Sequence, residues 1–348
     1  MRLSRRAILM GVAMAGLALA PGSTLTATAS AATGRDITLA AGHCIRVTAT
    51  IPLRSASGGI AVNPRTSTVY AAGFHLVFVI SEQTDTVVAA IPVGRGASAV
   101  AVNPKTNTIY VTNNRDATVS VINGRTRTVT ATIPVGRDPN GVAVNPNTNT
   151  AYVTSVLSDT VSVISGQTNT VVATIPVGAD AGGIAADPRT NTVYVAVAEG
   201  DKVSVINGQT NRVVATIPMS IAPTAIAVNP TTNTVYAPFG LNGKGDVAVI
   251  NGQTNTIVAT IPVGALPDGV AVNPAADIVY VANQEGFTSL NGTVSVINGQ
   301  TNKRLATIPV GVGPAGVAAD PKTNTAYVAN AATQGSPNSV SVLGPCPG

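Results

Sequence analysis

Short runs rich in Val, Ile, Ala and Thr alternate along the chain with clusters of Asn, Gly and Pro. Within residues 160–196 the apolar runs cover 160–164, 170–175, 183–186 and 192–195. Runs of this length and composition, bounded by turn-forming residues, are typical of β-strands joined by tight turns. No helical period competes with this pattern, so the sequence predicts an all-β protein.

The four-run pattern is repeated along the whole chain. An Asn-Pro or Asp-Pro pair marks each copy, with spacings of 40, 42, 42, 42, 44 and 47 residues, at Asn63, Asn103, Asn145, Asp187, Asn229, Asn273 and Asp320. In each copy Asn-Pro-x-Thr-Asn-Thr offers a turn with Pro to set φ and an Asn able to adopt the left-handed conformation. Seven units of four antiparallel strands predict a seven-bladed β-propeller.

The two ends of the chain are predicted to meet in the last blade. Residues 43–52 align on the fourth strand at 167–176, whereas the last unit ends after its third strand, at 339–343. The N-terminal strand is therefore expected to close the ring. In this register Cys44 and Cys346 are neighbours in one turn, which favours a disulfide in an exported chain. The alternative is a metal site formed by His43, Cys44 and Cys346, which lacks a fourth ligand.

Residues 1–31 have the features of an export signal. Arg2, Arg5 and Arg6 precede an apolar run at 7–20, and residues 29–31 (Ala-Ser-Ala) offer a cleavage site. Residues 4–9 resemble a twin-arginine signal. We expect a linker at 32–42, a single propeller at 43–348, and a bacterial protein that is extracellular or bound to the cell envelope. No later run approaches the length of a membrane helix.

Removal of the signal makes the charge almost balanced. Three of the 20 basic residues leave with it, so that 17 remain against 15 acidic residues. The repeats contain no stripe of Lys or Arg interleaved with aromatic residues, so nucleic-acid binding is not predicted.

The second strand of several blades carries a recurring tetrapeptide. It reads Tyr-Val-Thr-Asn at 110–113, with variants at 152–155, 280–283 and 327–330, while 70–73 and 236–239 depart from it. Over residues 43–348 the chain resembles the YVTN family of β-propeller repeat proteins. The resemblance implies a seven-bladed propeller, often found on exported or surface-layer proteins, and it implies no catalytic residues.

All seven tyrosines occupy this one strand position, once per blade. They could form a ring of aromatic platforms for a ligand. The favoured interpretation is that each packs between adjacent blades and gives its hydroxyl a buried partner.

Variation in length is confined to one connection. From the Tyr to the third strand the chain takes 7, 9, 9, 9, 11, 14 and 13 residues in the seven blades, whereas the other spacings are constant. This loop emerges at the same end of the ring as the links between blades. Varied loops on a rigid scaffold commonly carry recognition, and the channel mouth at this end offers a concave site. The candidate binding face comprises Phe74, His75, Arg115, Asp116, Asp138, Asp180, Glu199, Asp201, Phe239, Lys244, Asp246, Asp268, Glu285 and Phe287.

Two functions remain open at this stage. The leading hypothesis is an exported, non-catalytic scaffold that binds a protein, glycan or cell-envelope partner through this varied face, with no cofactor. The alternative is a metal-dependent propeller enzyme of the lactonase or lyase kind, with His75, Glu199 and Glu285 as acid-base groups near the channel mouth. Carboxylates on this face could hold a divalent cation there.

Overall fold

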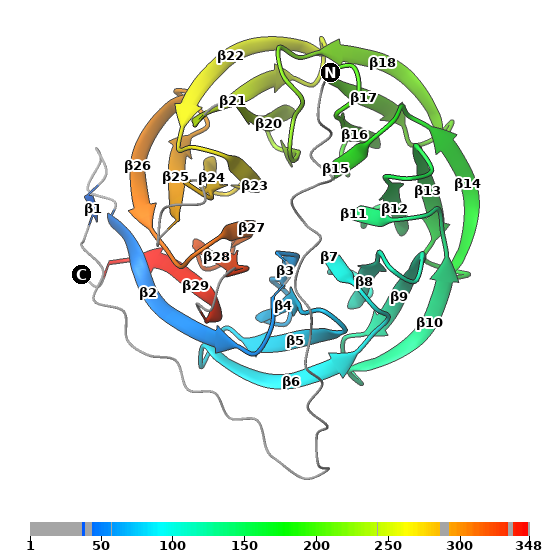
Figure 1. Ribbon diagram of the computed structural model, residues 1–348, viewed down its shortest axis with the longest axis horizontal. Helices are drawn as coiled ribbons and strands as arrows, with labels where there is room; N and C mark the ends of the chain where they lie inside the picture. The colour runs from blue at the N-terminus through cyan, green and yellow to red at the C-terminus, as the bar shows by residue number, and fades with distance from the viewer. Residues whose placement is uncertain are drawn as a thin grey trace.

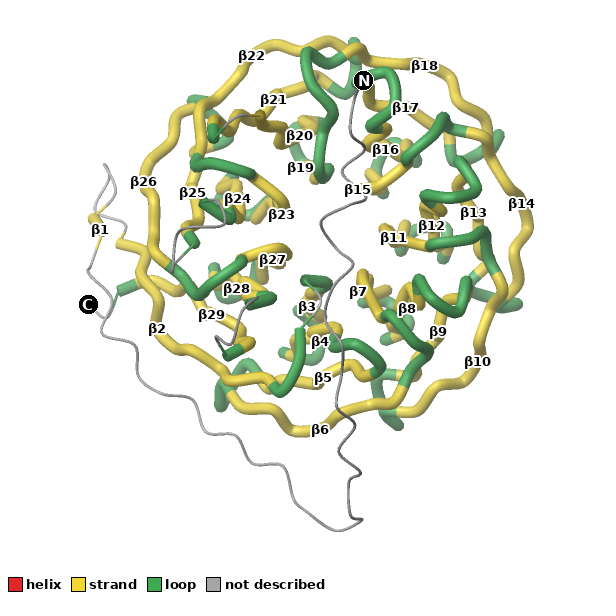
Figure 2. Tube along the Cα trace, viewed as in Figure 1, coloured by secondary structure: helices red, strands yellow, loops and turns green. Residues whose placement is uncertain are grey.

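The computed structural model describes residues 37–38, 44–56, 58–241, 243–285, 292–332 and 337–346. These residues form 29 strands and no helix. Seven sheets stand around a central axis, with one strand of each at the axis and one on the outer rim (Figures 1 and 2). The predicted seven-bladed β-propeller is therefore confirmed. The described part of the chain offers no helix of the length and apolarity that a membrane crossing needs.

Each blade is an antiparallel sheet whose strands follow one another from the axis outward. Blades 1 to 3 consist of β3 (Ile60–Asn63), β4 (Thr68–Ala72), β5 (Leu76–Ser81), β6 (Thr86–Pro92); β7 (Ala97–Asn103), β8 (Thr108–Asn113), β9 (Thr118–Asn123), β10 (Thr128–Pro134); and β11 (Pro139–Asn145), β12 (Thr150–Ser155), β13 (Thr160–Ser165), β14 (Thr170–Pro176). Blades 4 to 6 consist of β15 (Ala181–Asp187), β16 (Thr192–Val197), β17 (Lys202–Asn207), β18 (Arg212–Pro218); β19 (Ala227–Asn229), β20 (Thr234–Leu241), β21 (Lys244–Asn251), β22 (Thr256–Val263); and β23 (Pro267–Asn273), β24 (Ile278–Asn283), β25 (Thr293–Asn298), β26 (Lys303–Pro309).

Blade 7 joins the two ends of the chain. It combines β27 (Pro314–Asp320), β28 (Thr325–Asn330) and β29 (Asn338–Pro345) with the N-terminal strand β2 (Cys44–Leu53), and β1 (Ile37–Thr38) pairs with the outer edge of β2. In the register of β2 and β29, Ile51 lies opposite Val340 and Ile45 opposite Pro345. Closure by the N-terminal strand is thus confirmed. The expected export signal, most of the linker and His43 lie outside the described residues.

The predicted disulfide closes the same blade. Cys44 and Cys346 are bonded, with their Cα atoms 5.2 Å apart and a sequence separation of 302. The amide of Cys346 also donates a hydrogen bond to the carbonyl of Cys44 (3.1 Å). Since both sulfurs are used in this bond, the alternative metal site at these cysteines is wrong.

The tyrosines pack between blades. Every one of the seven is at most 2% exposed, so they form no platform for a ligand. The hydroxyl of Tyr194, in blade 4, donates to the carbonyl of Gly252 in the next blade (3.3 Å). Burial raises the pKa of Tyr194, Tyr236 and Tyr280 to about 12. The packing of the tyrosines between blades is confirmed. The expected hydroxyl partner is found for Tyr194, whereas Tyr236 has none among the described residues.

The last two residues of the tetrapeptide also have structural partners. The hydroxyl of Thr154 donates to the carbonyl of Gly182 on the inner strand of the next blade (2.7 Å). The amide of Asn113 donates to the hydroxyls of Thr118 and Ser120 on the third strand of its own blade (3.0 and 2.9 Å). The motif therefore serves inter-blade packing and buried hydrogen bonding, which explains its recurrence without any catalytic role.

A second set of side-chain contacts runs around the end opposite the varied loops. The Asn that precedes Pro donates its amide to a left-handed Asn or Asp of the next blade, at 2.7 to 3.0 Å, in the pairs Asn63–Asn107, Asn103–Asn149, Asn145–Asn191, Asn229–Asp277 and Asn273–Asn324. All five acceptor residues have φ between 51° and 56°. The predicted left-handed turn residue thus also holds adjacent blades together.

The inner strands approach one another closely at the axis. A Cβ atom added to Gly183 would lie 2.6 Å from the Cα of Ala225 in the next blade, and one added to Gly316 would overlap the carbonyl oxygen of Gly58. Glycine is needed there because only its missing side chain allows this approach.

Candidate functional site

The varied loops and the inter-blade links lie at the same end of the ring, as predicted. Backbone hydrogen bonds join a loop to the link before its own blade, at 2.9 to 3.1 Å, in the pairs Asn114–Gly96, Val156–Asp138, Ala198–Asp180, Gln284–Leu266 and Ala331–Gly313. The first residue of each pair donates its amide and the second accepts through its carbonyl. The face is therefore a network of bonded loops supported by rigid sheets.

Several of the predicted carboxylates occupy turn positions in this network. Asp138, Asp180, Asp201 and Glu285 have φ values of 55°, 61°, 46° and 58°. Asp tolerates the left-handed conformation better than most residues. The local backbone thus provides a structural reason for aspartate at three of these positions.

Hydrogen bonds hold two of the predicted carboxylates within blade 6, Glu285 among them. The Asp268 carboxylate accepts a hydrogen bond from the Gln284 amide (2.8 Å), and the Glu285 carboxylate accepts one from the Thr293 hydroxyl. Within the described ranges, no group of three His, Cys, Asp or Glu side chains is arranged to hold a metal ion. The predicted set of carboxylates is therefore spread around the ring.

Blades 1 and 2 bring five polar and aromatic side chains together, which we call the blade 1–2 cluster: Phe74, His75, Arg95, Arg115 and Asp116. The Arg115 guanidinium lies 4.4 Å from the centre of the Phe74 ring, and the His75 ring meets that ring edge-on at 6.3 Å. Asp116 accepts from the Arg95 amide (2.7 Å) and side chain (2.8 Å). These hydrogen bonds, and then the charge of Arg95, lower the pKa of Asp116.

Blade 5 differs from the prediction in its local structure. Its long connection was expected to be a loop, but β20 and β21 continue as a hairpin, with Leu241 paired to Lys244 and Phe239 to Asp246. Phe239 is only 7% exposed because its ring packs in the core between blades 4 and 5. The residue anchors the hairpin.

The extended hairpin forms one wall of a cavity of about 340 Å³, which we call the blade 5 hollow. Its lining residues are Ile221, Phe239, Gly240, Leu241, Lys244 and Asp246. Leu241 is 51% exposed at its rim. Three of the predicted residues, Phe239, Lys244 and Asp246, meet here. Apolar side chains with a Lys and an Asp beside them suit an apolar side chain of a partner that also carries charge.

The structure does not unite all the predicted residues in one site. The blade 1–2 cluster and the blade 5 hollow belong to different blades, Asp138, Asp180, Glu199 and Asp201 belong to blades 3 and 4, and Phe287 lies outside the described residues. At the axis, glycines of the inner strands lie directly against the backbone of the next blade. Neither the blade 1–2 cluster nor the blade 5 hollow includes a residue of an inner strand.

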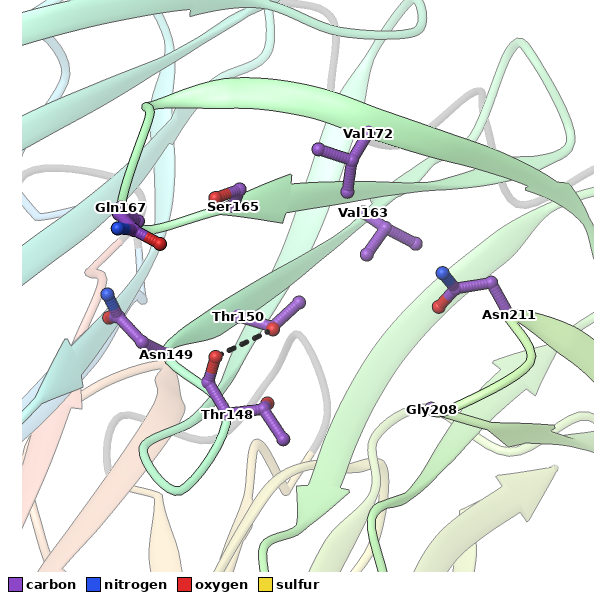
Figure 3. A pocket seen from close by; sticks show the side chains of 9 residues that line it. All are labelled: Thr148, Asn149, Thr150, Val163, Ser165, Gln167, Val172, Gly208 and Asn211. Atoms are coloured by element: carbon purple, nitrogen blue, oxygen red, sulfur yellow. Dashed lines mark hydrogen bonds between the residues drawn. The ribbon is translucent and has the colours of Figure 1, made fainter.

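A second cavity, of about 240 Å³, was not predicted. It lies at the opposite end of the ring, between blades 3 and 4, and is lined by Thr148, Asn149, Thr150, Val163, Ser165, Gln167, Val172, Gly208 and Asn211 (Figure 3). We call it the 3/4 seam cavity. The sequence analysis did not predict it because two different repeats contribute to the lining. The available signal was the identity of these positions from one repeat to the next.

Comparisons with known proteins show the fold. No protein-family model matches the chain, and no curated protein matches it. A chain of Kuenenia stuttgartiensis hydrazine synthase is similar in structure, with a TM-score of 0.56 and 18% identity over 67% of this chain and 92% of that one. U3-55K is also similar, with a TM-score of 0.73 and 14% identity over 88% of this chain and 99% of that one. At such identities the likeness establishes that the chain is a β-propeller scaffold.

Proposed function

We propose that the chain is an exported, non-catalytic β-propeller that binds a partner of the cell envelope through its variable-loop face, and that the partner is a protein. The blade 5 hollow is the observation that carries this proposal. Its lining combines the apolar Ile221 and Leu241 with Lys244 and Asp246. An exposed apolar side chain at the rim of a hollow, beside charged side chains, suits contact with a protein partner.

The rest of the fold supports this assignment. The Cys44–Cys346 bond suits an oxidising compartment, where exported proteins fold. The resemblance to YVTN repeat proteins, often exported or on surface layers, agrees with it. Among the described residues of the face, His75 contacts the Phe74 ring, and Glu285 is bonded to Thr293. Neither contact prepares an acid-base pair.

The hollow can be tested by reversing its character. The variant Leu241→Asp, Lys244→Glu should lower saturable capture of an envelope protein from the organism's own extract by at least 10-fold. It places a charge at the exposed apolar side chain and reverses the sign of the charge at residue 244. Competition with soluble wild-type protein would establish saturability. Val129→Asp is the matched control, since Val129 is an exposed valine (37%) on the outer strand of blade 2.

Thermal unfolding of both variants would show that the fold is retained. If the double variant captured the same protein as strongly as the control did, the blade 5 hollow would not be the binding site. If wild-type protein captured nothing that competes, the binding function itself would be wrong.

A further inference from the structure

We propose that the 3/4 seam cavity and the equivalent positions between blades 4 and 5 and between blades 5 and 6 are three sites for a neutral sugar ring. These sites lie at the end opposite the variable loops and would serve in addition to the proposed partner binding. The starting point is the 3/4 seam cavity, which blade 3 lines with Thr150, Val163, Gln167 and Val172 and blade 4 closes with Gly208 and Asn211. Figure 3 shows the Asn211 amide directed across the cavity toward the residues of blade 3.

The same lining is repeated at the next two seams. Of the nine lining positions, eight carry identical residues at all three seams, and the ninth is Ser165, Asn207 or Asn251. For example, Gln167 corresponds to Gln209 and Gln253. Because the repeats share one register of strand pairing, the corresponding side chains occupy equivalent places.

The other four seams each carry a charge at one or more of these positions. Arg127 stands at the Asn211 position between blades 1 and 2, and Arg125 at the Gln167 position between blades 2 and 3. Asp277 stands at the Asn149 position between blades 6 and 7, and Glu82 at the Gly208 position between blades 7 and 1. The uncharged lining is thus confined to three consecutive seams.

The chemistry of this lining selects the ligand. It contains no charged side chain, so it does not suit an anion, and no carboxylate or thiolate for a metal ion. Side-chain amides and hydroxyls both donate and accept hydrogen bonds, as recognition of sugar hydroxyls requires. Val172, which is 59% exposed, provides an apolar surface for the carbon face of a ring, and the lining also includes the buried Val163.

An extended peptide fits the cavity less well. Pairing with a peptide strand needs free backbone groups. The backbone amide of Gly208 already donates to the Asn191 carbonyl (2.8 Å), and the backbone amide of Asn211 donates to the Asn207 carbonyl (2.9 Å). By contrast, side-chain acceptors remain unused at all three seams. The Oδ1 atoms of Asn211, Asn255 and Asn302 are buried and accept no hydrogen bond from the described residues. Such an acceptor favours a hydroxyl donor nearby.

The experiment follows the methyl signals of Val163, Val205 and Val249, one at each seam, during titration with the methyl glycosides of glucose, mannose and galactose. We expect at least one glycoside to shift all three valines with saturation at millimolar concentration, and the matching neutral polysaccharide to bind at least 10-fold more tightly through several contacts on one ring. The variant Gln167→Ala, Gln209→Ala, Gln253→Ala should weaken the shifts at least 10-fold. Gln83→Ala, at the seam that holds Arg127, is the control.

A gain of function sharpens the test. Arg125→Gln with Thr130→Val gives the seam between blades 2 and 3 the Gln and Val of the other three, so Val121 should also respond and the stoichiometry should rise from three to four. The proposal is overturned if no glycoside shifts these valines, if the triple variant binds like the control, or if only an uncharged peptide produces the shifts. The Leu241→Asp, Lys244→Glu variant should bind the sugar normally, which separates this site from the proposed partner site.

Discussion

At the scale of single residues, the repeated tyrosine shows that one position can have different energetics in different blades. Tyr194 and Tyr236 are both fully buried. The Tyr194 hydroxyl donates to the Gly252 carbonyl at 3.3 Å, whereas the Tyr236 hydroxyl is buried without a partner in the described structure. A buried hydrogen bond stabilises modestly, while a buried group left without one is unfavourable.

Replacing each tyrosine by phenylalanine should separate these two cases. Tyr194→Phe removes a hydrogen bond and leaves a carbonyl without it, so we expect the free energy of unfolding to fall by about 1 kcal/mol. Tyr236→Phe removes a hydroxyl that has no partner and should leave stability unchanged or raise it. Chemical denaturation of both variants gives the comparison. Equal losses would mean that the Tyr236 hydroxyl has a partner, such as a buried water.

The residue scale is also where the sequence was least informative about the site. Phe239 was expected in a loop, but it lies in β20, where its buried ring anchors the hairpin. Asp138 and Asp180 were chosen for their charge, yet both occupy left-handed turns. A single sequence shows that a residue is charged or aromatic. It does not show its φ angle or the side of a hairpin on which it lies, and these depend on the length to which the strands continue.

At the scale of elements, the turn between β5 and β6 differs from its counterparts. Glu82 stands where blades 2 to 6 have glycine, and it approaches Asp320 and Tyr327 across the seam between blades 7 and 1. Asp320 stands where Asn donates an amide at five other seams, and Ser67 stands at the acceptor position that Asn or Asp occupies there. Burial, and then the adjacent Asp320 carboxylate, raise the pKa of Glu82 to about 8. Burial, and then the charge of Glu82, raise the pKa of Tyr327.

This pKa predicts a pH dependence of stability. Because the folded protein holds the Glu82 proton more tightly than the unfolded chain does, the contribution of Glu82 to stability should be fully present below about pH 4.5, be lost as the pH rises, and level off above about pH 8. Glu82→Gln should flatten the part of this profile between those limits. Chemical denaturation across this pH range measures it, with Asp116→Asn as a control because the carboxylate of Asp116 is paired on the surface with Arg95. A wild-type profile no steeper than that of Glu82→Gln would contradict the assignment.

The elements themselves were largely predictable. The four runs in the copy at 160–196 correspond to β13, β14, β15 and β16, and each strand is longer than its predicted run. The composition of each apolar run and the turn residues that bound it indicate a strand locally, and the same pattern recurs in every repeat. The seam cavity was not predictable in this way. It requires that two neighbouring repeats pack side by side in a known register, and the pattern within a single repeat does not give that register.

At the scale of the whole molecule, the ring depends on a junction between its two ends. β2 and β29 pair along their length, and the Cys44–Cys346 bond joins them at one end of that ladder. A cross-link between residues so far apart in sequence restricts the unfolded chain strongly. The folded ring does not need the bond for its geometry, since the strand ladder and the buried Ile51 and Val340 already connect the ends.

Removal of the disulfide should therefore lower stability while leaving the propeller intact. We expect the variant Cys44→Ser, Cys346→Ser to lose about 2 to 5 kcal/mol in the free energy of unfolding, because the chain-entropy term for a loop of this length is on the order of 5 kcal/mol and native strain reduces it. Denaturation with and without reductant measures the loss, and reductant should destabilise only the wild-type protein. The contact surface of each blade is unchanged in the variant, so its near-native sheet signal at low denaturant would show that the strand ladder closes the ring. An unfolded variant would instead mean that the ladder of β2 and β29 cannot hold blade 7 without the covalent bond.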